Sequence, residues 1–371
     1  MPHGLSGAAL PSSDGRAVAE ERRRGRGAGL NGSGRFERLS RECFDDGWDS
    51  LEDLPPLKTE VQEERARTII TRNESPDISF DRSINPYRGC EHGCIYCFAR
   101  PSHAYMGLSP GLDFETRLFA KPNAAALLER ELSRPGYVPR VIAIGTNTDP
   151  YQPLERGYKL MRDILEVLEN CGHPVAIVTK SALVTRDIDI LARLAERSLV
   201  KVALSVTTLD RKLCRAMEPR ASASYKRLGA IKALSEAGIP TSVMMAPIIP
   251  ALTDSEIEAL LEAAAEHGAT EAAYILLRLP LEVSELFRDW LLRERPDRYR
   301  HVMNLIRSMR GGKDYDAKWG ERMRGRGPYA DQIAKRFSLA AKRLNLNLRR
   351  KKLATEHFVQ PQKGGVQLSL F

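Results

Sequence analysis

Three of the six cysteines are clustered, at Cys90, Cys94 and Cys97. Gaps of three and two residues allow one short loop to bring three thiolates to a single metal centre, and Gly89 and Gly93 give that loop backbone freedom. In a chain without a secretory signal, such clustering indicates metal ligation rather than a disulfide framework. Three protein ligands also leave one ligand position free for a substrate.

Two kinds of metal centre are compatible with these residue types. The cysteines can hold a [4Fe–4S] cluster with one open iron, or a structural zinc ion with His92 or His103 as the fourth ligand. A chance grouping of buried structural cysteines is the third interpretation. Residue type and spacing alone leave all three open.

The surrounding sequence predicts parallel α/β architecture. Apolar, β-rich runs alternate with amphipathic helical segments, which indicates right-handed βαβ units. The runs lie near residues 78–80, just before the cysteines, and at 141–144, 175–178, 200–204, 243–246 and 274–277. A full eight-unit barrel needs roughly 250 residues, and the segment 66–290 is two units short. The predicted fold is therefore a partial (β/α)6 TIM-like barrel.

Four regions are predicted along the chain. Residues 1–62, rich in Gly, Ser, Arg and Pro, are expected to be a poorly ordered basic N-terminal arm, which can also lie over the folded domain. Residues 63–290 form the barrel and residues 291–352 a basic helical C-terminal extension. Residues 353–371 are expected to be a flexible tail.

The charge distribution suggests one class of partner. The net charge is +9, from 57 Lys and Arg against 48 Asp and Glu, and basic residues gather at 22–26, 322–326 and 349–352. These clusters suit a polyanion such as nucleic acid, and solvated arginines on exposed segments are an equal alternative. No apolar run reaches the roughly 18 residues of a membrane span, and no signal peptide is recognisable, so a cytoplasmic location is predicted.

The cysteine motif resembles a known signature. The pattern C-x3-C-x-aromatic-C after the first β-rich run is similar to that of the radical S-adenosylmethionine (SAM) superfamily, and the resemblance covers about residues 78–280. Within it, the chain most resembles the branch related to spore photoproduct lyase, which reverses a thymine-dimer lesion in DNA. It is also similar to a bacterial family of uncharacterised radical SAM proteins that share the words RGRGA, NPYRGC, GTNTDPYQPLE and WGER.

The resemblance implies the cofactors and the chemistry. In this superfamily, the open iron of a [4Fe–4S] cluster chelates the methionine part of SAM, and an electron from a low-potential donor drives cleavage to a 5′-deoxyadenosyl radical. That radical abstracts a hydrogen atom from the substrate. Cys90, Cys94 and Cys97 would then be the cluster ligands, while the protein supplies orientation and a dry site.

Polar residues after three of the β-rich runs are expected to contact SAM, because ligands of parallel sheets bind at the carboxyl ends of the strands. By similarity to the lyase, Thr148 and Asp149 correspond to a Ser-Asp pair near SAM, and Lys180 approaches its carboxylate. Ser205 corresponds to a serine near SAM. The structural alternatives are a helix cap, a solvated lysine and a half-buried strand serine.

Two aromatic residues flank the last cysteine of the motif. Tyr96 and Phe98 are predicted to stack on the adenine of SAM, and the alternative is that both are core residues.

The hydrogen donor of the lyase has no counterpart. Thr146 stands where that enzyme has a hydrogen-donating cysteine, and a hydroxyl is a poor hydrogen-atom donor, so the same repair step is in doubt. Cys214, which follows the fourth β-rich run, is a possible donor, with a buried small apolar residue as the alternative.

The chain ends in a peptide resembling those with which bacterial DNA polymerases and repair proteins bind the replication sliding clamp. Leucine and phenylalanine enter apolar pockets and the glutamine amide bonds at the rim. The matching residues are Gln367, Leu368, Leu370 and Phe371, after a Gly-Gly tether at 364–365. An accidental tail or a strand tucked on the domain is the alternative.

Together these features give a leading hypothesis of a radical SAM enzyme acting on nucleic acid, with repair or modification of DNA as its specific form. One alternative is a radical SAM enzyme acting on RNA, protein or a small metabolite. Another is a zinc-stabilised DNA-binding module without catalysis.

Overall fold

The computed structural model describes residues 17–37, 56–348 and 350–361. Its main sheet has the order β10-β9-β8-β7-β6-β3-β2. The parallel strands are β3 (Arg82–Ile84), β6 (Ile142–Ile144), β7 (Val175–Thr179), β8 (Val200–Ser205), β9 (Thr241–Ile248) and β10 (Glu271–Leu276). Strand β2 (Ile70–Arg72) adds antiparallel to β3. Each parallel strand pairs with the next along the chain and the ends of the sheet stay apart, so the predicted partial (β/α)6 barrel is confirmed.

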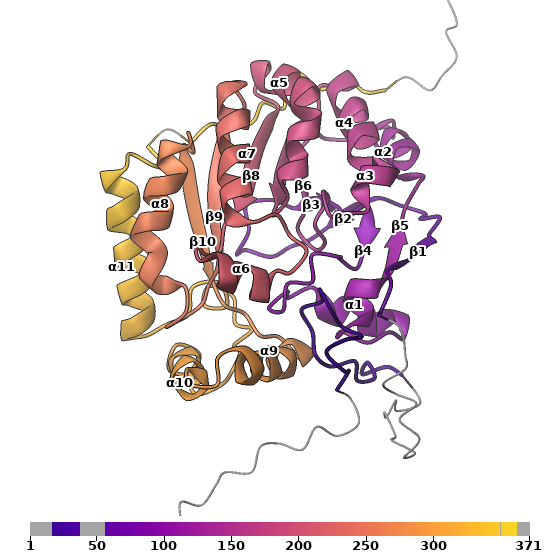
Figure 1. The fold of residues 1–371 in the computed structure, drawn as a ribbon. Helices are drawn as coiled ribbons and strands as arrows, with labels where there is room; N and C mark the ends of the chain where they lie inside the picture. The colour runs from indigo at the N-terminus through magenta and orange to yellow at the C-terminus, as the bar shows by residue number, and fades with distance from the viewer. Residues whose placement is uncertain (1–16, 38–55, 349, 362–371) are drawn as a thin grey trace, which may run out of the picture.

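Amphipathic helices cover the outer face of the sheet and form an arc around it (Figure 1). They are α2 (Ala124–Leu132), α4 (Leu160–Asn170), α5 (Ile188–Glu196), α7 (Ser224–Glu236) and α8 (Ile257–Glu266). Helix α4 buries Leu160, Met161, Ile164, Leu165 and Leu168, the face that the sequence periodicity predicts.

The first strand lies slightly later than predicted. Residues 78–80 follow a turn and are only partly buried, and β3 begins at Arg82. This strand is hard to recognise in the sequence because two of its three residues are polar. Arg82 and Ser83 are nevertheless buried, and Arg82 Nη1 donates to the Val138 carbonyl at 2.6 Å.

Short elements surround the carboxyl end of the barrel. A small sheet pairs β1 (Glu60–Glu63) parallel and β4 (Tyr87–Arg88) antiparallel to β5 (Arg117–Ala120). The short helices are α1 (Asp113–Thr116), α3 (Glu155–Tyr158), α6 (Arg211–Met217) and the 3₁₀ turns η1 (Arg100–Met106), η2 (Ala182–Asp187) and η3 (Asp254–Glu256).

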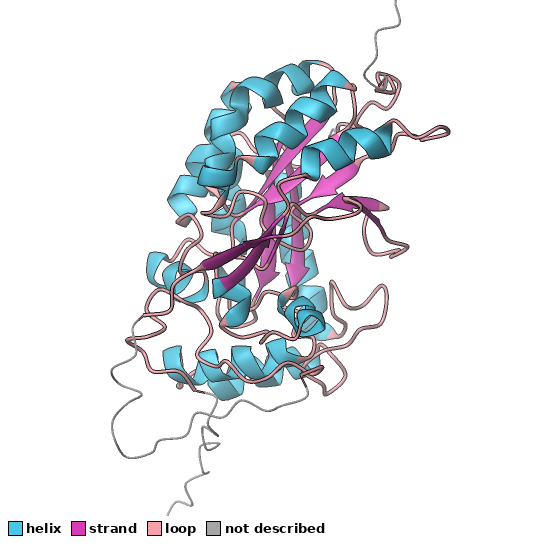
Figure 2. Cartoon of the chain, turned by 90° about the vertical axis from the view of Figure 1, so that its right-hand side faces the viewer, coloured by secondary structure: helices cyan, strands magenta, loops and turns pink. Residues whose placement is uncertain are grey.

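A helical C-terminal extension follows β10. Helices α9 (Glu282–Glu294) and α10 (Tyr299–Ser308) lie across one end of the barrel, while α11 (Pro328–Arg343) packs along α8 (Figures 1 and 2). Arg336 and Glu258 form a two-bond ion pair between α11 and α8. In the described part of the chain, no helix has the length and apolar character that crossing a membrane requires.

The segment after α11 returns to the opposite end of the barrel. The Ala354 amide donates to the Ser198 carbonyl and the Val359 amide to the Cys171 carbonyl. Phe358 packs against Tyr137 and His173. This part of the predicted flexible tail is therefore anchored, because an aromatic side chain finds an apolar niche there. Gln367, Leu368, Leu370 and Phe371 lie outside the described residues.

Candidate active site

The three clustered cysteines lie on the loop between β4 and η1, at the carboxyl end of the barrel. Cys90 and Cys94 are buried and Cys97 is half-buried. Gly89 has φ of +73°, and a Cβ there would lie 2.5 Å from Leu118 Cδ2, so this turn requires glycine. The loop thus has one fixed path that turns its cysteines inward.

Two buried side chains hold the backbone of this cysteine loop. The Gln152 amide accepts from the Glu91 amide at 2.8 Å and donates to the Gly89 carbonyl at 3.2 Å. Arg100, which is fully buried, donates to the carbonyls of Cys94 and Gly93. Neither residue is predicted from the sequence. Gln152 lies in the GTNTDPYQPLE word, but nothing in the sequence reveals its target.

Arg100 also forms a buried ion pair with Glu115 at 2.5 Å, and this carboxylate connects the loop to the N-terminal segment. Glu115 accepts from the amides of Gly27 and Ala28, at 2.8 and 2.9 Å. Arg26 donates to the Glu115 carbonyl at 2.9 Å. The RGRGA word (residues 24–28) is therefore packed against the cysteine loop (Figure 1), which matches the alternative of an N-terminal arm that lies over the folded domain. The amino-acid composition of this segment could not show that Glu115, far along the chain, accepts hydrogen bonds from the backbone amides of Gly27 and Ala28.

Three of the residues predicted to contact SAM come together beside the cysteine loop. Lys180 Nζ donates to Ser205 Oγ at 2.5 Å and to the Ala246 carbonyl at 3.0 Å. The same ammonium lies 5.7 Å from the centre of the Tyr96 ring. Burial lowers the pKa of Lys180, while the nearby Cys94 thiol opposes that shift. This group places a cation, a hydroxyl and an aromatic face at the carboxyl ends of β7 and β8.

Asp149 supports that group from behind. Its carboxylate accepts from the Thr179 hydroxyl at 2.6 Å and the Lys180 amide at 2.7 Å, and lies 3.4 Å from His92 Nδ1. Burial alone would raise the pKa of Asp149, but His92 and these hydrogen bonds lower it to about 2. Thr148 is buried and donates to the Tyr87 carbonyl at 3.1 Å. Contact of both residues with SAM stays a prediction, and their present bonds position the loop.

A buried acid that the sequence does not predict lies beside the Tyr96 hydroxyl. Glu218 accepts from the Tyr96 and Thr207 hydroxyls and pairs with the fully buried Arg227. Cys214 is in the same cluster, with Sγ 3.7 Å from Glu218 Oε2. Cys214 is 4% exposed, so its role as hydrogen donor stays a prediction. Glu218 follows α6 with no neighbouring motif, and only tertiary contacts identify it.

Phe98 is the one predicted SAM contact that lies apart from this group. Its ring is 43% exposed and stacks on the Arg278 guanidinium, 4.7 Å from ring centre to the guanidinium carbon. The structure therefore turns Tyr96 inward and Phe98 outward from the same loop.

The basic clusters are only partly free for a polyanion. Arg26 is buried, and Arg322 is bound by Asp77 and Ser75. Of the third cluster, residues 350–352 are exposed. An arginine that pairs with an acid far along the chain, as Arg322 does with Asp77, is not available to a polyanion, although it belongs to a basic cluster in the sequence.

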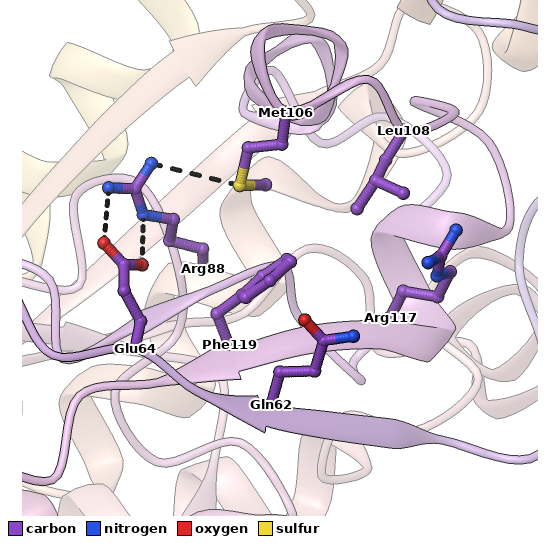
Figure 3. Close-up of a pocket in the computed structure, with 7 residues that line it drawn as sticks. All are labelled: Gln62, Glu64, Arg88, Met106, Leu108, Arg117 and Phe119. Atoms are coloured by element: carbon purple, nitrogen blue, oxygen red, sulfur yellow. Dashed lines mark hydrogen bonds and ion pairs between the residues drawn. The ribbon is translucent and has the colours of Figure 1, made fainter.

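A surface cavity also lies on the small sheet (Figure 3). Arg88, two positions before Cys90, projects into it and is held by Glu64, with Met106 alongside. Its lining residues are Gln62, Glu64, Arg88, Met106, Leu108, Arg117 and Phe119. None of the predicted cluster or SAM residues is among them, so this cavity is separate from the site.

Sequence comparison identifies the family. A sequence model of the radical SAM superfamily matches residues 84–264. An uncharacterised protein of Mycobacterium tuberculosis (strain H37Rv) is 41% identical over 230 residues, covering 61% of this chain and 68% of that protein. An uncharacterised protein of Methanocaldococcus jannaschii is 28% identical over 247 residues, covering 67% and 88%.

Solved structures of spore photoproduct lyase share the fold. One aligns with a TM-score of 0.55 and 16% identity over 76% of this chain and 79% of the lyase. A lyase structure with bound AdoMet and dinucleoside spore photoproduct aligns with the same TM-score at 15% identity. The chain belongs to the radical SAM superfamily: it is a radical SAM enzyme, and its cofactors are a [4Fe–4S] cluster and SAM.

The donor set beside the cysteine loop fits these cofactors. Burial raises the pKa of all three cysteine thiols, so thiolates are stable there only beside positive charge, which iron supplies. In the described residues, no three His, Cys, Asp or Glu side chains surround one point as a single metal ion requires. Of the alternative zinc ligands, His92 pairs with Asp149, while His103 bonds the Arg117 carbonyl through Nε2 and its buried Nδ1 has no hydrogen-bond partner.

Proposed function

We propose that this enzyme acts on DNA, repairing or modifying a nucleotide. The observation that carries the proposal is the fold shared with spore photoproduct lyase, which has been solved in complex with a dinucleoside spore photoproduct. The exposed basic residues 350–352 add a surface attractive to phosphate. DNA as substrate also favours the cytoplasm as the location.

In this proposal Cys90, Cys94 and Cys97 bind the cluster, and Gln152 and Arg100 fix the backbone that carries them. Together the two cofactors supply one-electron cleavage of SAM, which begins hydrogen abstraction, and a low-potential donor provides the electron. The protein's own part is to orient its ligands and exclude water.

Lys180 and Ser205 present a positive charge and a hydroxyl that bind the carboxylate of SAM. Tyr96, held by Glu218 and Thr207, offers a fixed apolar face for the adenine. Thr148 and Asp149 lie on the loop after β6 and hold it in place, through bonds to the Tyr87 carbonyl and the Lys180 amide. Phe98 is 43% exposed and lies apart from this group, against Arg278.

The hydrogen donor is proposed to be a thiol other than the one known in the lyase. Thr146, which stands in that position, is unsuitable, so Cys214 is the candidate. Replacing Cys214 with Ser should leave SAM cleavage intact and slow substrate turnover. Equal turnover by the variant would exclude the role.

The substrate class is tested by incubating the reduced enzyme and SAM with ultraviolet-irradiated DNA and with undamaged DNA, and analysing both by mass spectrometry. Loss of a photoproduct, or a new modified nucleotide, is the expected result. SAM cleavage that is stimulated by RNA, peptide or a metabolite extract, but never by DNA, would overturn the proposal.

We further propose that the C-terminal peptide binds the replication sliding clamp. The described part of the chain ends at residue 361, at the end of the barrel opposite the cysteine loop. A clamp bound to the peptide that follows would therefore leave the cysteine loop and the SAM site accessible. Removing residues 367–371 should abolish clamp pull-down. Equal capture of the full-length and truncated proteins would contradict this.

A further inference from the structure

Arg278 occupies a particular place at the carboxyl end of the barrel. It follows β10, and its guanidinium lies against the outward face of Phe98, the residue after Cys97. Because Phe98 is 43% exposed, this pair forms part of the open rim beside the cysteine loop.

The present partners of Arg278 are weak. Nη1 lies 3.6 Å from the thioether of Met323, and Nη2 lies 3.4 Å from the Tyr315 hydroxyl. Its buried Nε has no hydrogen-bond partner. Arg278 also acts electrostatically on Asp77, but that carboxylate is already bonded to Arg322 and to the Gly320 amide. A guanidinium normally prefers a two-bond carboxylate or phosphate, so Arg278 is under-satisfied.

A second arginine adds to this unpaired positive charge. Arg310 is 2% exposed and donates only to carbonyls, of Leu277 at 2.9 Å and Glu321 at 2.8 Å. Among the described residues, neither Arg278 nor Arg310 forms an ion pair with a carboxylate, unlike Arg100 and Arg227. Leaving two cations unpaired in a partly dry rim is costly unless an anion binds there.

Both weak partners of Arg278 lie in the loop 311–327. All five glycines of this loop have left-handed φ values: Gly311, Gly312, Gly320, Gly325 and Gly327. The loop also carries Tyr315 and the 59% exposed Trp319. A phosphate oxygen would be a stronger acceptor for Arg278 than the Tyr315 hydroxyl or the Met323 thioether, and aromatic rings lie in the same loop.

We propose that Arg278 binds a phosphodiester of the DNA strand, with bases stacking on Phe98 and the aromatic residues of the loop 311–327. Phosphate replaces the thioether and phenol as the acceptor for the guanidinium. Stacking on exposed aromatic rings tolerates any base and suits an unpaired strand. This rests on the proposed action on DNA and names the residues that hold the strand at the rim.

The test uses full-length, cluster-reconstituted protein and a fluorescein-labelled oligothymidylate of roughly 12 nucleotides. Anisotropy titrations at several KCl concentrations compare wild type with Arg278→Ala, Arg278→Lys and the control Arg193→Ala. Arg193 lies on α5 and pairs with Glu169, so its loss removes the same charge far from the rim. Binding of SAM is measured in parallel by equilibrium dialysis.

The expected result is about tenfold weaker oligonucleotide binding by Arg278→Ala, with a salt slope reduced by about 0.7. Arg278→Lys should recover part of the affinity, Arg193→Ala should match wild type, and SAM binding should be unchanged. Wild-type affinity and salt slope in Arg278→Ala would overturn the inference and leave the proposed function standing. If Arg278→Ala instead lost SAM binding, Arg278 would belong to the SAM site, and the inference that it binds the DNA strand would be overturned. No oligonucleotide binding by wild type would remove the proposed function itself.

Discussion

At the scale of single residues, Lys180 joins most of the groups assigned to SAM. Its ammonium bonds Ser205 and faces Tyr96, and its backbone amide bonds Asp149. The ammonium is half-buried, donates to one hydroxyl and one carbonyl, and lies 3.9 Å from the Glu218 carboxylate, which already pairs with Arg227, so it has capacity for an anionic ligand.

Replacing Lys180 with Met keeps most of the side-chain volume and removes the charge. A hydrogen bond to a charged group is worth about 1.5–3 kcal/mol, so we expect SAM to bind roughly tenfold to a hundredfold more weakly. Equilibrium dialysis with radiolabelled SAM measures this under anaerobic conditions. Lys201→Met, on the same strand β8 as Ser205 but paired with Glu271, is the control and should bind normally. Unchanged affinity in Lys180→Met would exclude Lys180 from the SAM site.

At the scale of elements, the cysteine loop depends on a contact between segments far apart in sequence. The N-terminal RGRGA word and the loop share the Arg100–Glu115 pair. A Cβ on Gly27 would lie 1.9 Å from the Gly93 carbonyl oxygen, so the backbones touch at this point.

Gly27→Ala should therefore loosen the loop. Relieving such an overlap typically costs about 1–3 kcal/mol, which predicts a melting temperature lower by several degrees and faster loss of iron. Iron content and iron–sulfur absorption after gel filtration measure the second effect. Gly229→Ala, in α7 with open space around it, makes the same chemical change and should keep its iron. Equal iron retention in both variants would mean that the N-terminal segment does not support the cluster.

Strand positions and the cysteine motif could be predicted because their signals are local. The apolar runs at 175–178 and 200–204 match β7 and β8 closely, since buried parallel strands are continuously apolar. Glu115, Glu218 and Gln152 could not be predicted, because each contacts the site through at least one partner more than 60 residues away that no periodicity encodes. The outward turn of Phe98 likewise depends on Arg278, far along the chain.

At the scale of the whole molecule, buried histidines make stability depend on pH. His173 donates to the Pro174 carbonyl and accepts from the Tyr137 hydroxyl, and burial lowers its pKa from 6.5 to about 4. Burial likewise lowers the pKa of His103 to about 4. Because the folded protein holds both rings neutral, their contribution is complete above pH 6.5 and is lost as the pH falls toward 4.

For each of the two histidines, the free energy of unfolding at pH 5.5 should be about 1–2 kcal/mol lower than at pH 7.5. Melting temperatures between pH 7.5 and pH 5.5 should therefore fall in the wild type. His173→Gln should show about half of that dependence, and the exposed His301→Gln should show all of it. An undiminished pH dependence in His173→Gln would show that His173 can become protonated without disturbing the fold.

The central claim is that the cysteine loop supports radical SAM chemistry, and one assay tests it most directly. Purified wild type and Cys94→Ala are reconstituted anaerobically with iron and sulfide, reduced with dithionite and given SAM, and 5′-deoxyadenosine is quantified. We predict that the wild type forms 5′-deoxyadenosine and that Cys94→Ala forms none. A wild-type protein that binds zinc, shows no iron–sulfur absorption and leaves SAM intact would contradict the account.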